Sequence, residues 1–273
     1  MAGRRSPFKK AKNSLVLQER DKKIIALCHE YHFLTREQIR LLLGFSRNRA
    51  STRLRKLFDN GYLSRRFLPV IQGSGKILYF PGPRGIEIIS EKSGIDPLKI
   101  KQKRKQILEI RNFSLPHYLL INEFRIAFSL ASRNIPEISL KSWNTQKEIP
   151  LRLEGKEFYP DAYFVYGYRN KLYNLFLEVD RSTETNGRFL GKVNNYLKYG
   201  FDGYYQKQSG FQFFRVLVTC KSMARLQNLN KLIEQKTDKM FWLALQADIS
   251  PGKILGKIWH RPARSSLFSI LED

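Results

Sequence analysis

Two hydrophobic runs on either side of a short polar turn place the strongest constraint on how this chain folds. The runs are FYPDAYFVYGY, residues 158–168, and LYNLFLEVD, residues 172–180, and the residues between them are RNK, 169–171. Aromatic and aliphatic runs of this length around a polar turn predict the two strands of a β-hairpin. Acidic residues lie at the beginning of the first strand and at the end of the second, so this hairpin also carries candidate functional residues.

The three acidic residues of the hairpin are Asp161, Glu178 and Asp180. Glu178 and Asp180 are two residues apart on one strand, so their side chains leave the same face, and a hairpin in the right register brings Asp161 beside Glu178. Carboxylates this close repel each other unless a cation lies among them. The sequence therefore predicts a site for Mg²⁺ or Mn²⁺ that activates water for phosphodiester cleavage. Alternatively, these three acids are only the polar ends of an ordinary hairpin.

The second half of the chain alternates strands and helices after one long apolar helix at 114–134. Strands are predicted at 139–144, 160–168, 172–180, 213–220, 239–245 and 252–261, and helices at 180–200 and 221–235. This order is typical of a mixed-sheet α/β domain. Its predicted range is 114–264, and residues 265–273 are expected to form a C-terminal tail.

Residues 19–95 predict a winged helix-turn-helix domain. Helices are expected at 20–34, 35–44 and 46–61, and strands at 62–68 and 77–82 around a glycine-rich tip, QGSGK, at 72–76. Thr35 and Gln38 have the spacing of a capping box, and Gly44 is a stop signal. In such domains the third helix enters the major groove of DNA and the wing contacts phosphates.

The third helix and the hairpin supply the candidate DNA-binding residues. Asn48 and Arg49 lie near the start of the helix, where Arg is suited to guanine and Asn to adenine. Other basic side chains are better placed for phosphates, which position a protein on DNA without specifying a sequence. The full candidate set is Arg47, Asn48, Arg49, Thr52, Arg53, Arg55, Lys56, Arg65, Arg66 and Lys76.

The net charge supports a polyanionic partner. Lys and Arg outnumber Asp and Glu by 49 to 24, a formal charge of +25 over 273 residues. Double-stranded DNA is the predicted partner, because A-form RNA hides its major groove from a recognition helix. The charge extends into a basic tail at 1–18 and a basic linker or helix at 96–113, which is either a solvated segment or an additional phosphate contact. A homodimer is left open.

The sequence lacks the signals of disulfide-rich, zinc-binding, secreted and membrane proteins. Cys28 and Cys220 lie in unrelated apolar segments and predict buried thiols rather than a disulfide, and four His residues do not have zinc-site spacing. The N-terminus lacks the apolar run of a signal peptide, and no stretch is long enough to span a membrane. We therefore expect a cytoplasmic protein without a membrane partner.

The second half resembles the PD-(D/E)xK nuclease frame of restriction enzymes and Holliday-junction resolvases. Glu123 in the long helix, Pro160-Asp161 and Glu178-Val179-Asp180 follow the order of that frame. The resemblance implies a restriction-endonuclease-like domain in which these acids and a lysine are catalytic. Asp180 occupies the usual lysine position, and Lys192 in the following helix is the predicted replacement.

The whole chain, from about residue 20 to 260, resembles the replication-relaxation family of mobile genetic elements. The matching pieces are LTREQI, GYLSRR, Trp143, PDAYF, FLEVDRSTET, Lys192, Tyr196, RVLVTCKSMAR and GKIW. The resemblance implies a plasmid or integrative-element protein acting in DNA replication, relaxation or transfer, with other replication or transfer proteins as partners.

Two functions follow from these patterns. One is a metal-dependent nickase directed to its site by the winged helix. The other is a non-catalytic initiator, accessory protein or regulator with a degenerate nuclease fold. A histidine-metal tyrosine relaxase is disfavoured, because no two His residues are separated by one residue. Tyr196 and Tyr199 are instead predicted to be packing residues with a polar tip.

Overall fold

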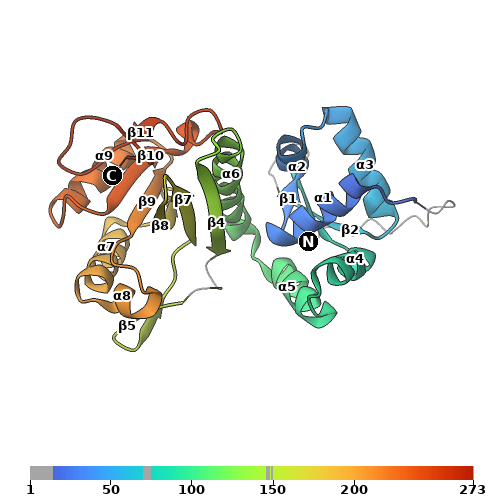
Figure 1. The fold of residues 1–273 in the computed structure, drawn as a ribbon, viewed down its shortest axis with the longest axis horizontal. Helices are drawn as coiled ribbons and strands as arrows, with labels where there is room; N and C mark the ends of the chain where they lie inside the picture. The colour runs from blue at the N-terminus through green and yellow to red at the C-terminus, as the bar shows by residue number, and fades with distance from the viewer. Residues whose placement is uncertain (1–14, 70–74, 146–147, 149, 273) are drawn as a thin grey trace. The chain divides into compact units, whose positions relative to one another are not determined.

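The chain divides into two compact units. The computed structural model describes residues 15–69, 75–145, 148 and 150–272. The first unit is residues 1–122 and the second is residues 123–273, and the division falls within helix α6 (Leu115–Ser132), which continues from one unit into the other (Figure 1).

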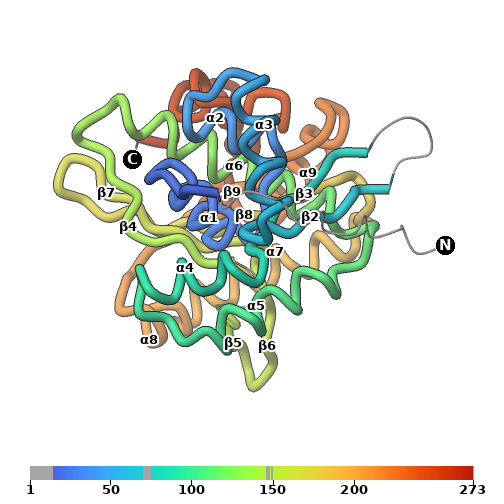
Figure 2. Tube along the Cα trace, turned by 90° about the vertical axis from the view of Figure 1, so that its right-hand side faces the viewer, coloured from blue at the N-terminus to red at the C-terminus, as the bar shows by residue number. Residues whose placement is uncertain are grey.

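The first unit contains five helices, a three-stranded sheet and the beginning of α6 among its described residues. Its elements in chain order are α1 (Glu19–Glu30), β1 (Leu34–Thr35), α2 (Arg36–Leu43), α3 (Arg47–Asp59), β2 (Leu63–Phe67), β3 (Ile77–Pro81), α4 (Pro83–Ser93), α5 (Pro97–Glu109) and the short helix η1 (Asn112–Ser114). The strands are antiparallel in the order β1-β3-β2, and β2 and β3 form a hairpin (Figure 2). Of the predicted glycine-rich tip, residues 72–74 lie outside the described residues.

The boundaries of the first helices agree with the capping signals in the sequence. The Thr35 hydroxyl accepts from the Gln38 backbone N–H (3.2 Å), and the Gln38 side chain accepts from the Thr35 N–H (2.9 Å), which completes the predicted capping box. Gly44 ends α2 with a φ of 66°, a left-handed conformation that glycine adopts without strain. Ser46 then caps α3 through the Arg49 N–H.

A buried ion pair joins α1 to α3. Arg53, a predicted DNA-binding residue, directs its guanidinium onto both carboxylate oxygens of Asp21. The Asp21 side chain is fully buried, whereas that of Arg53 is 16% exposed. Because removing one partner leaves a buried charge uncompensated, we assign Arg53 a structural role, and its DNA contact stays a prediction.

Replacing Arg53 by Met is expected to lower the free energy of unfolding by about 3 kcal/mol, the usual cost of breaking a buried ion pair. Urea denaturation measures the change. Arg49→Met, which removes an exposed arginine from the same helix, is the control and should leave stability within about 0.5 kcal/mol of wild type. Equal stability of the two variants would contradict the structural role.

The basic segment predicted as a linker or helix at 96–113 is helical and packs into the first unit. Ile100 and Ile107 of α5 are buried. Arg66, predicted to contact phosphate, donates hydrogen bonds to the carbonyl oxygens of Ile107 (3.0 Å), Leu108 (3.3 Å) and Ile110 (2.6 Å). Arg66 therefore caps the C-terminal end of α5, which leaves little of its guanidinium for a phosphate.

The second unit is built on a mixed five-stranded sheet. Its strands are β4 (Ile138–Thr145), β7 (Ala162–Tyr168), β8 (Lys171–Asp180), β9 (Arg215–Cys220) and β10 (Phe241–Leu245), in the order β10-β9-β8-β7-β4. The pairs β8–β9 and β9–β10 are parallel, whereas the pairs β4–β7 and β7–β8 are antiparallel. This arrangement confirms the predicted α/β class with a mixed sheet.

Helices cover both faces of this sheet. On one face, α7 (Asn186–Phe201) and α9 (Met223–Glu234) pack over Phe176, Val216 and Leu243. On the other face, Phe124 and Phe128 of α6 contact the ring of Phe164. The figure shows the same three layers, with the sheet between α6 and the α7–α9 pair (Figure 1).

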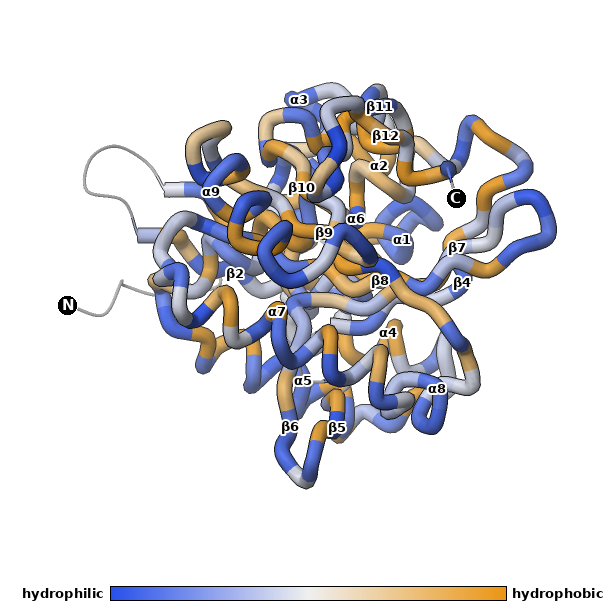
Figure 3. The backbone as a smooth tube through the Cα atoms, turned by 90° about the vertical axis from the view of Figure 1, so that its left-hand side faces the viewer, coloured by the Kyte–Doolittle hydropathy of each residue, from blue (hydrophilic) through white to orange (hydrophobic). Residues whose placement is uncertain are grey.

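Smaller elements complete the second unit. They are the hairpin of β5 (Leu151–Leu153) and β6 (Lys156–Phe158), the short helices α8 (Tyr204–Ser209) and η2 (Gln246–Asp248), and the pair β11 (Lys257–Trp259) and β12 (Phe268–Ser269). The β5–β6 hairpin and α8 lie near α7 (Figure 3). Sequence patterns did not predict this hairpin or α8, because each strand has only three residues and the helix only six.

The segment predicted as a C-terminal tail, 265–273, is part of the second unit as far as residue 272. Ile270 is fully buried, and its carbonyl oxygen accepts hydrogen bonds from the Tyr166 hydroxyl (2.6 Å) and from Arg215 (3.0 Å). Two side chains of the sheet thus bind the backbone of this segment, which packs against the second unit. Among the described residues, no helix combines the length and the apolar character needed to cross a membrane.

Candidate functional site

The β7–β8 hairpin brings Asp161 beside Glu178. Arg169 and Asn170 form the turn with φ values of 47° and 63°, as a tight two-residue hairpin turn requires. The turn sets the register Ala162↔Leu177, so Asp161, one residue before the strand, lies across from Glu178. Asp161 donates its N–H to the Leu177 carbonyl (3.0 Å) and accepts the Val179 N–H on Oδ2 (2.7 Å). The predicted juxtaposition of these two carboxylates is confirmed.

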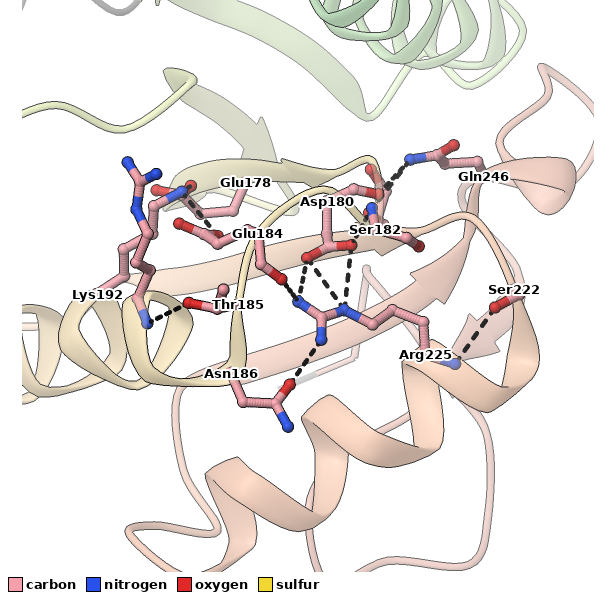
Figure 4. Close-up of polar contacts among 12 residues, drawn as sticks. Glu178, Asp180, Ser182, Glu184, Thr185, Asn186, Lys192, Ser222, Arg225 and Gln246 are labelled. Atoms are coloured by element: carbon pink, nitrogen blue, oxygen red, sulfur yellow. Dashed lines mark hydrogen bonds and ion pairs between the residues drawn. The ribbon is translucent and has the colours of Figure 1, made fainter.

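Helix α7 adds a lysine and a tyrosine to this pair. Lys192 Nζ lies 2.8 Å from Glu178 Oε2, and the Tyr196 hydroxyl donates to Glu178 Oε1 at 2.7 Å. Lys192 also pairs with Glu184 at 3.4 Å (Figure 4). Thr185 caps the start of α7, and residues 192 and 196 are one turn apart on the face towards the sheet. We call Asp161, Glu178 and Lys192 the acid–lysine cluster.

Burial and charge control the protonation of the acid–lysine cluster. Glu178 is 5% exposed, and burial raises its pKa to about 7, with the nearby Asp161 charge acting in the same direction and Lys192 opposing it. For Lys192, burial acts to lower the pKa, but the charges of Glu178 and Asp161 outweigh it, so the pKa is raised. Lys192 is therefore cationic at neutral pH.

The raised pKa of Glu178 predicts a pH-dependent stability. Because the folded protein binds this proton more tightly than the unfolded chain does, the contribution of Glu178 is greatest below pH 4.5 and falls as pH rises through 7. In EDTA, wild type should lose about 2 kcal/mol between pH 5 and pH 8 relative to Glu178→Gln, which has no group to titrate. Urea denaturation at the two pH values measures this difference. Parallel pH profiles for the two proteins would contradict it.

Asp180 takes no part in the cluster. Its carboxylate accepts three hydrogen bonds from Arg225 of α9, the shortest at 2.8 Å, and one from the N–H of Ser182 at 2.6 Å. Glu178 points towards α7 and Asp180 towards Arg225 (Figure 4). Within the described part of the chain, no three His, Cys, Asp or Glu residues are grouped so that they could hold one metal ion. The structure thus does not gather Asp161, Glu178 and Asp180 into the expected three-acid set.

The remaining two carboxylates still fit a magnesium ion. Mg²⁺ usually binds one or two protein carboxylates and keeps several of its water ligands. When ionised, Asp161, Glu178 and the adjacent Glu184 carry three negative charges against one positive charge on Lys192. This charge imbalance favours a divalent cation, with Asp161 and Glu178 as the residues that would hold it. The metal-binding role stays a prediction.

Glu123 and the DNA-binding candidates are the remaining predicted site residues. Glu123 is exposed on α6, and its predicted place in the site stays a prediction. Arg65 lies over the Phe58 ring, with its guanidinium carbon 4.0 Å from the ring centroid. The exposed candidates are Arg47, Asn48, Arg49, Thr52, Arg55 and Lys56 on α3 and Lys76 beside β3. Arg65, on β2, is partly exposed.

Two residues that shape the site had no role in the sequence interpretation. Arg225 neutralises Asp180, and Glu184 pairs with Lys192. Ser222, as the N-cap of α9, places Arg225 in the first turn of that helix. This capping signal is present in the sequence, but the acid that Arg225 binds depends on how α9 packs.

These features define an α/β protein with a mixed sheet and an acid–lysine cluster at the end of two neighbouring strands, joined to a helical unit with a small sheet. A family model described as Replication-relaxation matches residues 25–214, which is more than half of the chain. The chain belongs to the replication-relaxation family. A comparison with curated proteins gives no match.

Among solved structures, two of the restriction endonuclease FokI are similar to this chain. The first has 14% identity and a TM-score of 0.29, covering 84% of this chain and 42% of FokI. The second, FokI bound to DNA, has 12% identity and a TM-score of 0.28, covering 85% and 43%. The chain thus spans less than half the length of FokI.

Proposed function

We propose that this protein binds double-stranded DNA of a plasmid or other mobile element and nicks it with Mg²⁺ or Mn²⁺ during replication, relaxation or transfer. Membership of the replication-relaxation family supports the process. The observation that carries the nicking activity is the acid–lysine cluster, in which Lys192 Nζ lies 2.8 Å from Glu178 and Asp161 lies across the hairpin.

The cluster has the chemistry that phosphodiester cleavage needs. A bound Mg²⁺ would activate water and offset charge on the leaving oxygen. Asp161 and Glu178 would hold this ion, and the raised pKa of Lys192 keeps a positive charge beside the phosphate throughout the reaction. Tyr196 fixes Glu178 by its hydrogen bond, so that the carboxylate keeps one orientation.

The first unit supports binding of duplex DNA. Its order of helices and hairpin is typical of winged helix-turn-helix domains, in which the third helix lies in the major groove. Here that helix is α3, whose exposed face is basic at Arg47, Arg49, Arg55 and Lys56. We propose that Asn48 and Arg49 contact base edges and that the other basic residues contact phosphates.

A non-catalytic DNA-binding protein is the second candidate. It is favoured by the fact that both oxygens of Glu178 already have partners and that Asp180 is bound by Arg225. In this alternative the acids stabilise the fold, and the second unit contacts DNA without cutting it.

Incubation of the protein with supercoiled DNA of the element and Mg²⁺ or Mn²⁺ separates the two candidates. Nicking converts the supercoiled form to open circles, and EDTA should prevent it. Tight, salt-sensitive binding with no cleavage in either metal would contradict the nickase and leave the second candidate.

A further inference from the structure

A cavity of about 640 Å³ lies in the second unit next to the acid–lysine cluster. Tyr163 on β7 lies two residues after Asp161, and Phe176 on β8 lies two residues before Glu178. Alternate residues of a strand share one face of the sheet, so the cavity and the cluster lie on the same face. Two residues of a strand span about 7 Å, which is within the reach of a single nucleotide.

The lining of this cavity is mainly aromatic. Tyr163, Phe176, Tyr199, Tyr205 and Phe211 contribute rings to it. Most of these rings are held by ring–ring contacts; for example, Phe176 meets Tyr205 edge to face with centroids 6.1 Å apart. Such a lining offers flat apolar surfaces that are fixed before any ligand binds.

A few polar groups complete the cavity. The Tyr205 hydroxyl is buried beside the Tyr163 hydroxyl. Gln208 bonds to the backbone of Arg152 and accepts the Tyr199 hydroxyl proton at 3.1 Å. The Arg152 side chain, which is 73% exposed and pairs with Glu157 at 3.6 Å, also lines the cavity. The cavity thus combines stacking surfaces with hydroxyl and amide groups that can hydrogen-bond to a ligand.

We propose that this cavity takes one unpaired nucleobase of the strand that the acid–lysine cluster cuts. A nucleobase is the part of DNA that is both flat and edged with hydrogen-bonding groups, and bases stack on aromatic side chains regardless of sequence. Bases of an intact duplex are stacked in the helix, so the substrate must contain an unpaired or flipped nucleotide. This inference rests on the proposed nicking function and specifies its substrate as locally unpaired DNA.

Fluorescence anisotropy tests this proposal with two labelled duplexes. One carries a single bulged thymine, and the other carries an abasic nucleotide at that position. Both are titrated with the full chain in EDTA, so that no strand is cut. Wild type should bind the thymine duplex about tenfold more tightly, the scale of stacking one base on aromatic residues. Equal affinities would overturn the proposal.

Variants of Phe211 test whether the preference for the thymine duplex arises in this cavity. Phe211→Ala should abolish the preference for thymine. Because Phe211 also packs against the core, Phe211→Leu, which keeps an apolar side chain without a ring, distinguishes loss of stacking from loss of folding. Phe213→Ala, at a neighbouring ring that is 81% exposed and does not line the cavity, should keep the full preference. A preference that persists in both Phe211 variants would contradict the proposal.

The outcome is separate from that of the nicking experiment. If the protein nicks DNA but does not prefer the thymine duplex, the proposed base-binding site is rejected and the proposed nicking activity stands. If the protein prefers the thymine duplex but does not nick DNA, the proposed nicking activity is rejected. Failure to bind either duplex contradicts the proposed function itself.

Discussion

Glu178→Gln is expected to reduce metal-dependent nicking by more than about a hundredfold, the range seen when a group that stabilises developing charge is removed. Gln has nearly the same shape as Glu but no charge, so it is a poorer ligand for Mg²⁺ and no longer attracts the Lys192 ammonium. The conversion of supercoiled to open-circle DNA measures the rate. Affinity for DNA in EDTA should stay within about twofold of wild type, since Glu178 is buried behind α7.

Glu234→Gln is the matched control for this prediction. It makes the same chemical change at an exposed position at the end of α9, and it should nick at the wild-type rate. If Glu178→Gln also nicks at that rate, the acid–lysine cluster has no catalytic role, and any cleavage observed comes from elsewhere.

The double variant Arg47→Ala/Arg49→Ala is expected to weaken binding to duplex DNA by at least about tenfold at physiological salt, because each arginine lost removes a contact with DNA. The slope of log affinity against log salt should fall by about 0.9 for each phosphate contact removed. Both side chains are exposed on α3, so stability should not change.

Lys231→Ala/Lys236→Ala removes two exposed positive charges from the second unit and is the control for net charge. If both double variants lose affinity equally, the effect is one of total charge rather than of α3. Arg49→Ala alone should relax the preference between target and unrelated sequences, by about 1–3 kcal/mol at one base pair. A uniform loss across all sequences would assign Arg49 to phosphate instead.

Local signals predicted much of the fold. The polar turn at 169–171 and the hydrophobic runs around it led to the right hairpin, and its register followed because a two-residue turn leaves little freedom. The caps at Thr35, Gly44 and Ser46 gave the helix ends in the first unit for the same reason: each is satisfied by neighbours a few residues away.

The sequence did not predict the side-chain pairings between residues far apart in the chain. Arg53 and Arg66 look like surface bases in a basic helix and strand, yet their partners lie 32 and at least 41 residues away. The fate of Asp180 likewise depends on Arg225, 45 residues further along the chain. No spacing rule connects such residues, because the packing of whole helices brings them together.

The Arg225 side chain also bonds to the Glu184 carbonyl (2.8 Å) and to Asn186 Oδ1 (2.7 Å), at the point where the chain enters α7. One guanidinium therefore anchors the strand end and the helix start together. Lys192 lies two turns further along that helix. The position of Lys192 next to Glu178 therefore depends on Arg225, which is on a different helix. A substitution at position 225 would therefore disturb the position of Lys192, although Arg225 itself lies outside the acid–lysine cluster.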